Sequence, residues 1–286
     1  MENNTDLSDV AQVLWDNDVN RLQPGIDYKI DLQDRAGQIL TNADVTDGAG
    51  LPLFLFVNEE FFKKKTFSAF ISLLDNYESD TRQPEIITPE EEREIHTFLD
   101  AVMETPVLQI AHRYLVEKGR AKVNKEQFKQ QLYDIWFSLY ARKGGSSQPD
   151  SSGFEHVFVG ETRGGRTVIG FHNWIQFYLQ EKLGHVDYRG YTMEKNHLKP
   201  DENKHLITLQ FSWKKGVKPR GSCFMGVSPE FEFALYTITF LSSSGRHQKL
   251  RFSQYEVEIV CHSNKYKNIE TTYPILLQYL AVTSWR

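Results

Sequence analysis

Residues 142–153, RKGGSSQPDSSG, separate two parts of the sequence that differ in their hydrophobic pattern. These residue types favour turns and lose little by staying solvated, so the stretch predicts a surface connection. Apolar residues recur at helical spacing before it and alternate with polar residues after it. We therefore predict an α+β fold, in which a helical N-terminal half packs on a C-terminal half of antiparallel β-sheet. The predicted subdomains are residues 1–145 and 146–286, within one continuous domain.

Several helix signals occur in the first half. The strongest is Thr88-Pro89-Glu90-Glu91, which combines an N-cap hydroxyl, a proline in the first turn and a carboxylate three residues after the cap. Apolar residues at helical spacing follow this signal, and they also follow Ser8, Asn58, Pro106 and Asn124. The sequence thus predicts a helix after each of these positions.

A period of two marks the second half. Residues 206–213 and 255–261 alternate between apolar and polar side chains, which is typical of strands. Two helices are predicted to interrupt these strands. One begins at Asn173 and ends before Gly184, and the other begins at Ser228.

Length and composition describe an ordinary globular chain. Its 286 residues, 40% of them hydrophobic, suffice to bury a core. No apolar run approaches the ~20 residues that cross a bilayer, and the N-terminus lacks the regions of a secretory signal. We expect a cytoplasmic or nuclear protein, and a secreted form stays open if a signal was removed. Cys223 and Cys261 form neither a disulfide framework nor a common zinc motif.

Charge is distributed unevenly between the two halves. Residues 1–150 hold 16 Lys and Arg against 26 Asp and Glu, whereas residues 151–286 hold 17 against 12. The second half is therefore basic within a chain of net charge −5. A basic half suits RNA binding, because neutralising phosphates supplies much of nucleic-acid affinity. Ordinary fluctuation of charge between halves is the alternative.

Two histidines flank a glycine-rich turn. The segments GFEHVFVGE (153–161) and TVIGFHNW (167–174) predict a β-hairpin that feeds a helix, with His156 and His172 on or beside its two arms. Their imidazoles could then converge on one cleft. If Asn173 caps the helix, its first backbone N–H groups are free to bind a phosphate beside His172.

The residues alone leave other interpretations open. His156 shares its predicted strand face with apolar side chains, so it could be a hydrogen-bonded core residue. Glu155 and Glu161 could join His156 and His172 as metal ligands, although no familiar metal-site spacing is present. This second interpretation would make the chain a metal-dependent phosphodiesterase.

Longer motifs identify a family. GFEHVFVGE, GFHNW, WKKGVKP (213–219) followed by GS, SPEFEFALYT (228–237) and TTYP (271–274) closely resemble the EndoU family of uridylate-specific endoribonucleases. The resemblance extends into the helical half, through LFLFVNEEFFKKKTFSAF (53–70). It implies cleavage of single-stranded RNA at uridines, without cleavage of DNA, by a lyase-type reaction.

The resemblance also implies roles for individual residues. His156 and His172 correspond to the family's catalytic histidines and Lys218 to its catalytic lysine. One histidine would deprotonate the ribose 2′-OH and the other would protonate the leaving 5′-oxygen, leaving a 2′,3′-cyclic phosphate. We favour His172 as base and His156 as acid. Glu155 and Glu161 are expected to support the imidazoles, and a solvated strand edge is their alternative.

Thr271 and Tyr273 correspond to the residues that hold uracil in the family, the hydroxyl bonding its polar edge and the ring stacking on its face. Their alternative is a structural role, as a strand end before a C-terminal helix. The family also implies a divalent cation, manganese or calcium. The sequence contains no EF-hand loop, so we expect the ion in the acidic half or on RNA phosphates, and the metal ligands stay unknown.

Two further expectations complete the prediction. A catalytically silent RNA-binding protein is the alternative to the enzyme, but such a protein has no reason to keep both histidines and the lysine. A monomer is expected, because the sequence contains no evident coiled-coil heptads.

Overall fold

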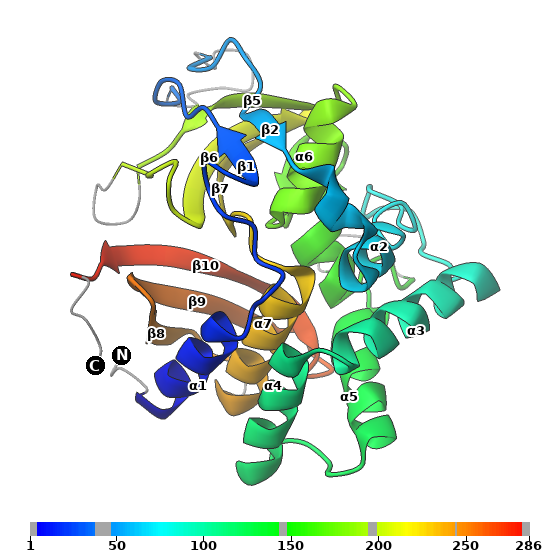
Figure 1. Cartoon of the computed structure of the whole chain (residues 1–286). Coiled ribbons are helices and arrows are strands. Elements are labelled where there is room, and N and C mark those ends of the chain that lie inside the picture. The colour runs from blue at the N-terminus through cyan, green and yellow to red at the C-terminus, as the bar shows by residue number, and fades with distance from the viewer. Residues whose placement is uncertain (1–4, 38–46, 143–147, 194–198, 244, 282–286) are drawn as a thin grey trace.

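The computed structural model describes residues 5–37, 47–142, 148–193, 199–243 and 245–281 (Figure 1). The predicted subdomain boundary, between residues 145 and 146, lies outside these ranges, and the division into two subdomains stays a prediction. No helix in the described ranges is both long enough and apolar enough to cross a membrane.

Helices dominate the first half, as predicted. Its elements are α1 (Thr5–Asp16), β1 (Tyr28–Ile30), β2 (Phe54–Val57), the 3-10 helix η1 (Glu59–Lys63), α2 (Lys65–Ile71), α3 (Pro89–Met103), α4 (Pro106–Glu117) and α5 (Lys125–Phe137). The capping box before α3 is present, since the Thr88 side chain accepts from the Glu91 N–H and the Glu91 carboxylate accepts from the Thr88 N–H. The segment after Asn58 differs from the prediction, because η1 and α2 replace a single helix.

The second half contains two sheets and the two predicted helices. Its elements are the π-helical turn η2 (Glu155–Val159), β3 (Glu161–Arg163), β4 (Thr167–Ile169), α6 (Trp174–Lys182), β5 (Val186–Tyr191), β6 (Leu206–Trp213), β7 (Gly216–Phe224), α7 (Pro229–Ser243), β8 (Gln248–Phe252), β9 (Tyr255–Ser263) and β10 (Ile269–Tyr279). One sheet has the order β3-β4-β7-β6-β5 and the other β10-β9-β8. All pairings are antiparallel except that of β4 with β7. The α+β class is confirmed.

Helix α7 is the centre of the core. Every residue from Pro229 to Phe240 is buried, and the helix lies between the N-terminal helices and the β8–β10 sheet (Figure 1). The Trp136 indole of α5 donates to the Thr237 hydroxyl at 2.9 Å, and Trp15 of α1 packs edge-on against Phe231. One hydrophobic cluster therefore continues across both halves.

The segment around His156 is where the structure departs most from the predicted hairpin. β3 and β4 do form a hairpin, but His156 precedes it in η2 and does not lie on a strand. The Ser152 hydroxyl accepts from the Glu155 N–H, and the Glu155 carbonyl accepts from the Gly160 N–H at 2.8 Å. All five residues of η2 are buried. The alternation of side chains in the sequence therefore did not mark a strand with one buried and one exposed face.

Candidate active site

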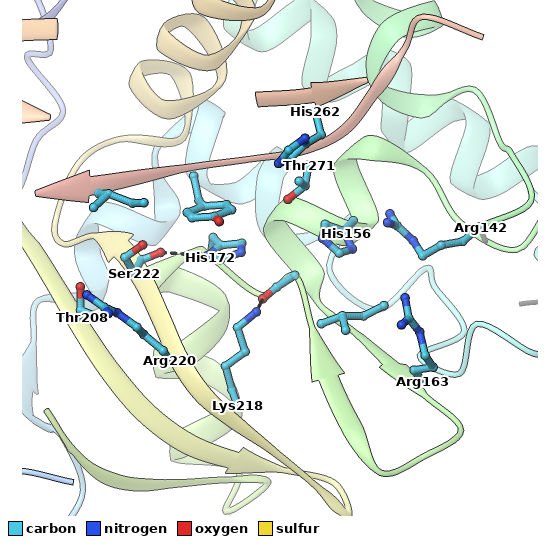
Figure 2. Close-up of a pocket in the computed structure, with 14 residues that line it drawn as sticks. Arg142, His156, Arg163, His172, Thr208, Lys218, Arg220, Ser222, His262 and Thr271 are labelled. Atoms are coloured by element: carbon cyan, nitrogen blue, oxygen red, sulfur yellow. Dashed lines mark hydrogen bonds between the residues drawn. The ribbon is translucent and has the colours of Figure 1, made fainter. Parts of the chain in front are cut away.

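A cleft of about 540 Å³ lies where β7, β10 and the segment from η2 to α6 meet (Figure 2). Its lining includes the three predicted catalytic residues and both predicted uracil-binding residues. The full set is Arg142, His156, Arg163, Ile169, Gly170, His172, Thr208, Lys218, Arg220, Ser222, His262, Thr271, Tyr273 and Ile275.

His156 is held from its backbone and from its ring. Its carbonyl accepts from the Phe171 N–H at 2.9 Å, and its Nδ1 donates to Glu161 Oε2 at 2.5 Å. Because a carboxylate accepts this bond, Nδ1 carries the proton and Nε2 is left for substrate. Burial lowers the pKa of His156 well below its usual value, and the charges of Arg142 and Lys218 lower it further.

His172 is anchored in a different way. Its N–H donates to the Val157 carbonyl at 2.8 Å, and its Nδ1 donates to the Ser222 carbonyl at 2.9 Å. The ring also stacks on Tyr273, with centroids 4.4 Å apart and an interplanar angle of 10°. Burial lowers the pKa of His172, and the Lys218 charge adds to this effect. At neutral pH this imidazole can therefore accept a proton at Nε2.

Helix α6 begins directly after His172, as predicted, but part of its N-terminus is already occupied. The Asn173 carboxamide oxygen accepts from the backbone N–H groups of Ile175 and Gln176, both at 3.0 Å. The Asn173 amide in turn donates to the buried Glu232 at 2.7 Å. The expectation that free N–H groups here bind phosphate is wrong for these two groups, because the cap satisfies them.

Lys218 enters the cleft from β7. Its ammonium donates to the Gly170 carbonyl at 2.7 Å, and only 9% of the residue is exposed. Burial lowers the pKa of Lys218 to about 8, so the side chain is mainly charged at neutral pH. Gly170 has φ +62°, and a Cβ at this position would lie 1.8 Å from the His156 carbonyl oxygen. Only glycine fits between these two catalytic candidates.

The two predicted supporting glutamates occupy different environments. Glu161 Oε2 accepts from His156 and also lies 3.2 Å from Arg142 Nε. Burial raises the pKa of Glu161, while the Arg142 charge favours its carboxylate form. Glu155 is equally buried but does not line the cleft, and neither of its oxygens has a hydrogen-bond partner within the described ranges. The alternative of a solvated strand edge is wrong for both.

Thr271 and Tyr273 lie two residues apart in β10, and both reach the cleft. The Thr271 hydroxyl is buried and has no hydrogen-bond partner in the described chain, so it is free to bind a polar group (Figure 2). The alternative of a strand end before a C-terminal helix is wrong, because β10 continues to Tyr279 and no helix follows it as far as residue 281.

Four cationic or titratable side chains of the cleft were not predicted: Arg142, Arg163, Arg220 and His262. Arg142 belongs to a segment whose composition indicates a solvated loop, yet only 7% of the residue is exposed. The guanidinium is buried because Glu161 and the Ser151 hydroxyl bind it, and no local pattern reveals these partners. The basic character of residues 151–286 was the sequence signal for Arg163, Arg220 and His262, and Arg142, which lies in the acidic half, had none.

Comparison with known proteins identifies relatives of this chain. Residues 6–274 match the family described as endoribonuclease XendoU. Uridylate-specific endoribonuclease B of Danio rerio is 65% identical over 98% of this chain and 99% of its own length. Poly(U)-specific endoribonuclease-B of Xenopus laevis is 53% identical over 96% and 94% of the two chains.

A solved structure extends the comparison to the fold. It is described as XendoU, a splicing-independent snoRNA-processing endoribonuclease, and it superposes with a TM-score of 0.84 at 50% sequence identity. The match covers 97% of this chain and 99% of the solved one. With the family match over nearly the whole sequence, the chain belongs to the XendoU endoribonuclease family.

Proposed function

We propose that this protein cleaves single-stranded RNA at uridines by transesterification, leaving a 2′,3′-cyclic phosphate. The observation that carries the proposal is the pair of buried imidazoles in one cleft, each with Nδ1 anchored so that Nε2 is available. Such a pair can remove one proton and deliver another during a single displacement at phosphorus. The names of the relatives support uridine as the preferred base.

The proton transfers can be assigned from the surroundings of each ring. His172 stacks on Tyr273, beside the proposed uracil site, and so suits the 2′-OH of the same nucleotide. Its Nε2 accepts that proton while the 2′-oxygen attacks phosphorus. His156 gives a proton to the departing 5′-oxygen as the P–O bond breaks. The phosphate's negative charge favours the protonated form of His156 that this step requires.

Lys218 supplies charge to the transition state. Its hydrogen bond to the Gly170 carbonyl fixes the ammonium group and leaves two N–H donors for a non-bridging phosphate oxygen. A fixed cation in a partly dry cleft stabilises developing negative charge more than it stabilises the ground state.

Uracil recognition is proposed for β10. The Thr271 hydroxyl, which has no partner among the described residues, can donate to a carbonyl oxygen of uracil or accept from its N3–H. The Tyr273 ring lines the cleft and stacks on His172, and uracil would stack on the same ring. Because the nucleophile is a 2′-OH, DNA should not be cut.

A divalent cation, manganese or calcium, is proposed to act away from the phosphorus. No group of three or more His, Cys, Asp or Glu side chains within the described ranges is arranged to hold a metal ion. The Nδ1 atoms of His156 and His172 are already bonded to Glu161 and to a carbonyl. These donors do not fit a metal at the reacting centre, so the ion is expected on RNA phosphates or in the acidic half.

The test uses an RNA oligomer with one uridine and its twin with 2′-deoxyuridine at that position, each with manganese, with calcium and with chelator. Cleavage of the ribose form alone, ending in a cyclic phosphate, is expected. Cleavage of both forms would overturn transesterification in favour of a metal-dependent phosphodiesterase. Cleavage of neither would leave an RNA-binding protein.

Single substitutions test the assigned roles. His156→Ala, His172→Ala and Lys218→Ala should each fold and lose about 10²-fold or more in cleavage rate. A variant that keeps most of its activity would remove that residue from the mechanism. Tyr273→Ala should lower both rate and uridine selectivity, and unchanged selectivity would exclude the stacking role.

A further inference from the structure

A second basic cavity lies beside the catalytic cleft, at the turn between β3 and β4. Its volume is about 710 Å³, and its lining includes Asp80, Arg82, Gly164, Arg166 and Lys215. The three cations outnumber the one carboxylate, so the lining carries two excess positive charges. None of these residues takes part in the mechanism above.

The cations of this cavity are arranged for a shared ligand. Thr167 of β4 pairs with Val217 of β7, which brings Arg166 next to the residues that begin β7. The Arg166 carbonyl lies 2.9 Å from an ideal Cβ on Gly216, so the two backbones are in close contact there. Arg166 and Lys215 are therefore neighbours across the strand pair, and both are exposed.

Among the described residues, no ion pair or side-chain hydrogen bond involves the Arg166 or the Lys215 side chain. Arg82 differs, because Asp80 holds it at 2.6 Å, and its guanidinium lies over Gly164. The free charge of the cavity thus comes from Arg166 and Lys215, and an anion is the complementary ligand.

The second cavity adjoins the cleft at the start of the β3–β4 turn. Arg163 lines the cleft, and the next residue, Gly164, lines the second cavity. Figure 2 shows Arg163 on the His156 side of the cleft, away from His172. An RNA strand that leaves the cleft past His156 therefore meets Arg163 first and the second cavity next.

We propose that the second cavity binds a backbone phosphate of the RNA on the 3′ side of the cleaved uridine. This inference rests on the proposed function. If uridine lies beside Tyr273 and His172, then His156 faces the leaving 5′-oxygen, which belongs to the next nucleotide in the 3′ direction. The downstream strand then runs towards Arg163 and the β3–β4 turn. Phosphate contacts position a strand without reading its sequence.

The experiment compares three substrates in the wild-type protein. One is a short oligomer with a single uridine, one carries a 3′ tail of about six deoxyadenosines, and one carries the same tail at its 5′ end. Deoxy tails supply phosphates but no cleavage site. We expect the 3′ tail to lower KM and the 5′ tail to leave it nearly unchanged. Failure to cut the short oligomer would instead refute the proposed function itself.

The Arg166→Ala/Lys215→Ala double variant should lose the benefit of the 3′ tail. Its KM for the 3′-tailed substrate should rise roughly tenfold at low salt, with kcat unchanged. The slope of log KM against log salt should fall by about 0.7 for each phosphate that the protein no longer neutralises. Binding of a tailed 2′-deoxyuridine oligomer, followed by fluorescence anisotropy, gives the same comparison without cleavage.

A charge-matched control distinguishes phosphate binding at the second cavity from general attraction of RNA by the protein's positive charge. Arg113→Ala/Lys125→Ala removes two exposed cations from α4 and α5, in the helical half. It should leave the effect of the 3′ tail intact. An equal loss in this control, an undiminished tail effect in Arg166→Ala/Lys215→Ala, or an equal effect of 5′ and 3′ tails would each overturn the proposal.

Discussion

Replacing Glu161 with glutamine should separate its proposed role in positioning His156 from its role in stabilising the fold. Its Oε2 accepts from His156 at 2.5 Å and lies 3.2 Å from Arg142, whereas Oε1 has no partner in the described chain. A glutamine can place its carbonyl oxygen at the Oε2 position and its amide at the Oε1 position. Glu161→Gln therefore keeps the shape and the acceptor and removes only the charge.

The loss of stability on substituting Glu161 follows from its contacts with His156 and Arg142. Hydrogen bonds to charged groups contribute about 1.5–3 kcal/mol each, roughly twice the neutral value, so losing the charge on one acceptor should cost about 2 kcal/mol of stability. Among the described residues, the other carboxylate near Arg142 is that of Glu270, whose Oε1 lies 3.5 Å away, and the Ser151 hydroxyl accepts from the guanidinium at 3.1 Å. Glu161→Ala should cost about 3–5 kcal/mol, because it leaves the buried Arg142 charge without its main partner.

The cleavage rate of Glu161→Gln should also fall, by more than its loss of stability explains. The carboxylate sets the proton on His156 Nδ1, whereas an amide can also turn its NH₂ towards that atom and favour the other tautomer. We expect a loss of about 10–100-fold in single-turnover cleavage rate at saturating RNA. Urea unfolding, monitored by tryptophan fluorescence, measures the stability change in the same samples.

A remote ion pair provides the control. Glu256 in β9 is largely buried and pairs with Arg251 at 3.1 Å, away from the cleft. Glu256→Gln should lower stability while leaving the cleavage rate unchanged. If Glu161→Gln behaves in the same way, with a wild-type rate and pH profile, then Glu161 only stabilises the fold and the positioning argument is refuted.

Three further outcomes follow from the site. Burial lowers the pKa of Lys218 to about 8. The cleavage rate should therefore fall more steeply above pH 8 in the wild type than in Lys218→Arg, because arginine keeps its charge. Parallel pH–rate profiles of the two proteins would contradict this. Burial raises the pKa of Glu232 to about 8. The contribution of Glu232 to stability is therefore present at low pH and is lost as pH rises from ~4.5 through 8, by up to about 1.4 kcal/mol per pH unit. Urea unfolding of Glu232→Gln should show a flatter dependence of stability on pH than the wild type. Gly170→Ala should lower the free energy of unfolding by about 3 kcal/mol or more, because its Cβ would lie 1.8 Å from the His156 carbonyl oxygen. Gly165→Ala is the control, since Gly165 has φ +67° and open space around it, and it should lower the free energy of unfolding by only about 1–2 kcal/mol. Thermal unfolding measures both.

Local signals predicted the helices well because their ends are determined by nearby atoms. The capping box at Thr88 and the Asn173 cap involve residues within three positions of each other, so the sequence contains both partners. The turn around His156 was misassigned for the opposite reason. Its backbone is held by Phe171 and its surroundings are buried on all sides, so alternation of side chains carried no information about the local conformation.

The proposed catalytic trio was predicted from family motifs and not from the spacing of the residues. Nothing in the spacing of His156, His172 and Lys218 requires them to meet, and the residues alone left a core histidine as an open interpretation. The buried Arg142 and the second basic cavity had no motif to reveal them. Both depend on contacts between segments far apart in the chain, such as the parallel bridge between Thr167 and Val217.

Ser222 links the two sheets at the cleft, and this contact would couple the proposed base recognition to the proposed catalysis. Ser222 of β7 accepts from His172 Nδ1 through its carbonyl, and its hydroxyl donates to the Pro274 carbonyl of β10 at 2.5 Å. Tyr273, the residue before Pro274, stacks on the same His172 ring. A shift of β10 relative to β7 would therefore move the proposed uracil site and the proposed base together. Substitutions that loosen this contact should lower kcat along with uridine selectivity, because neither sheet holds a complete site alone.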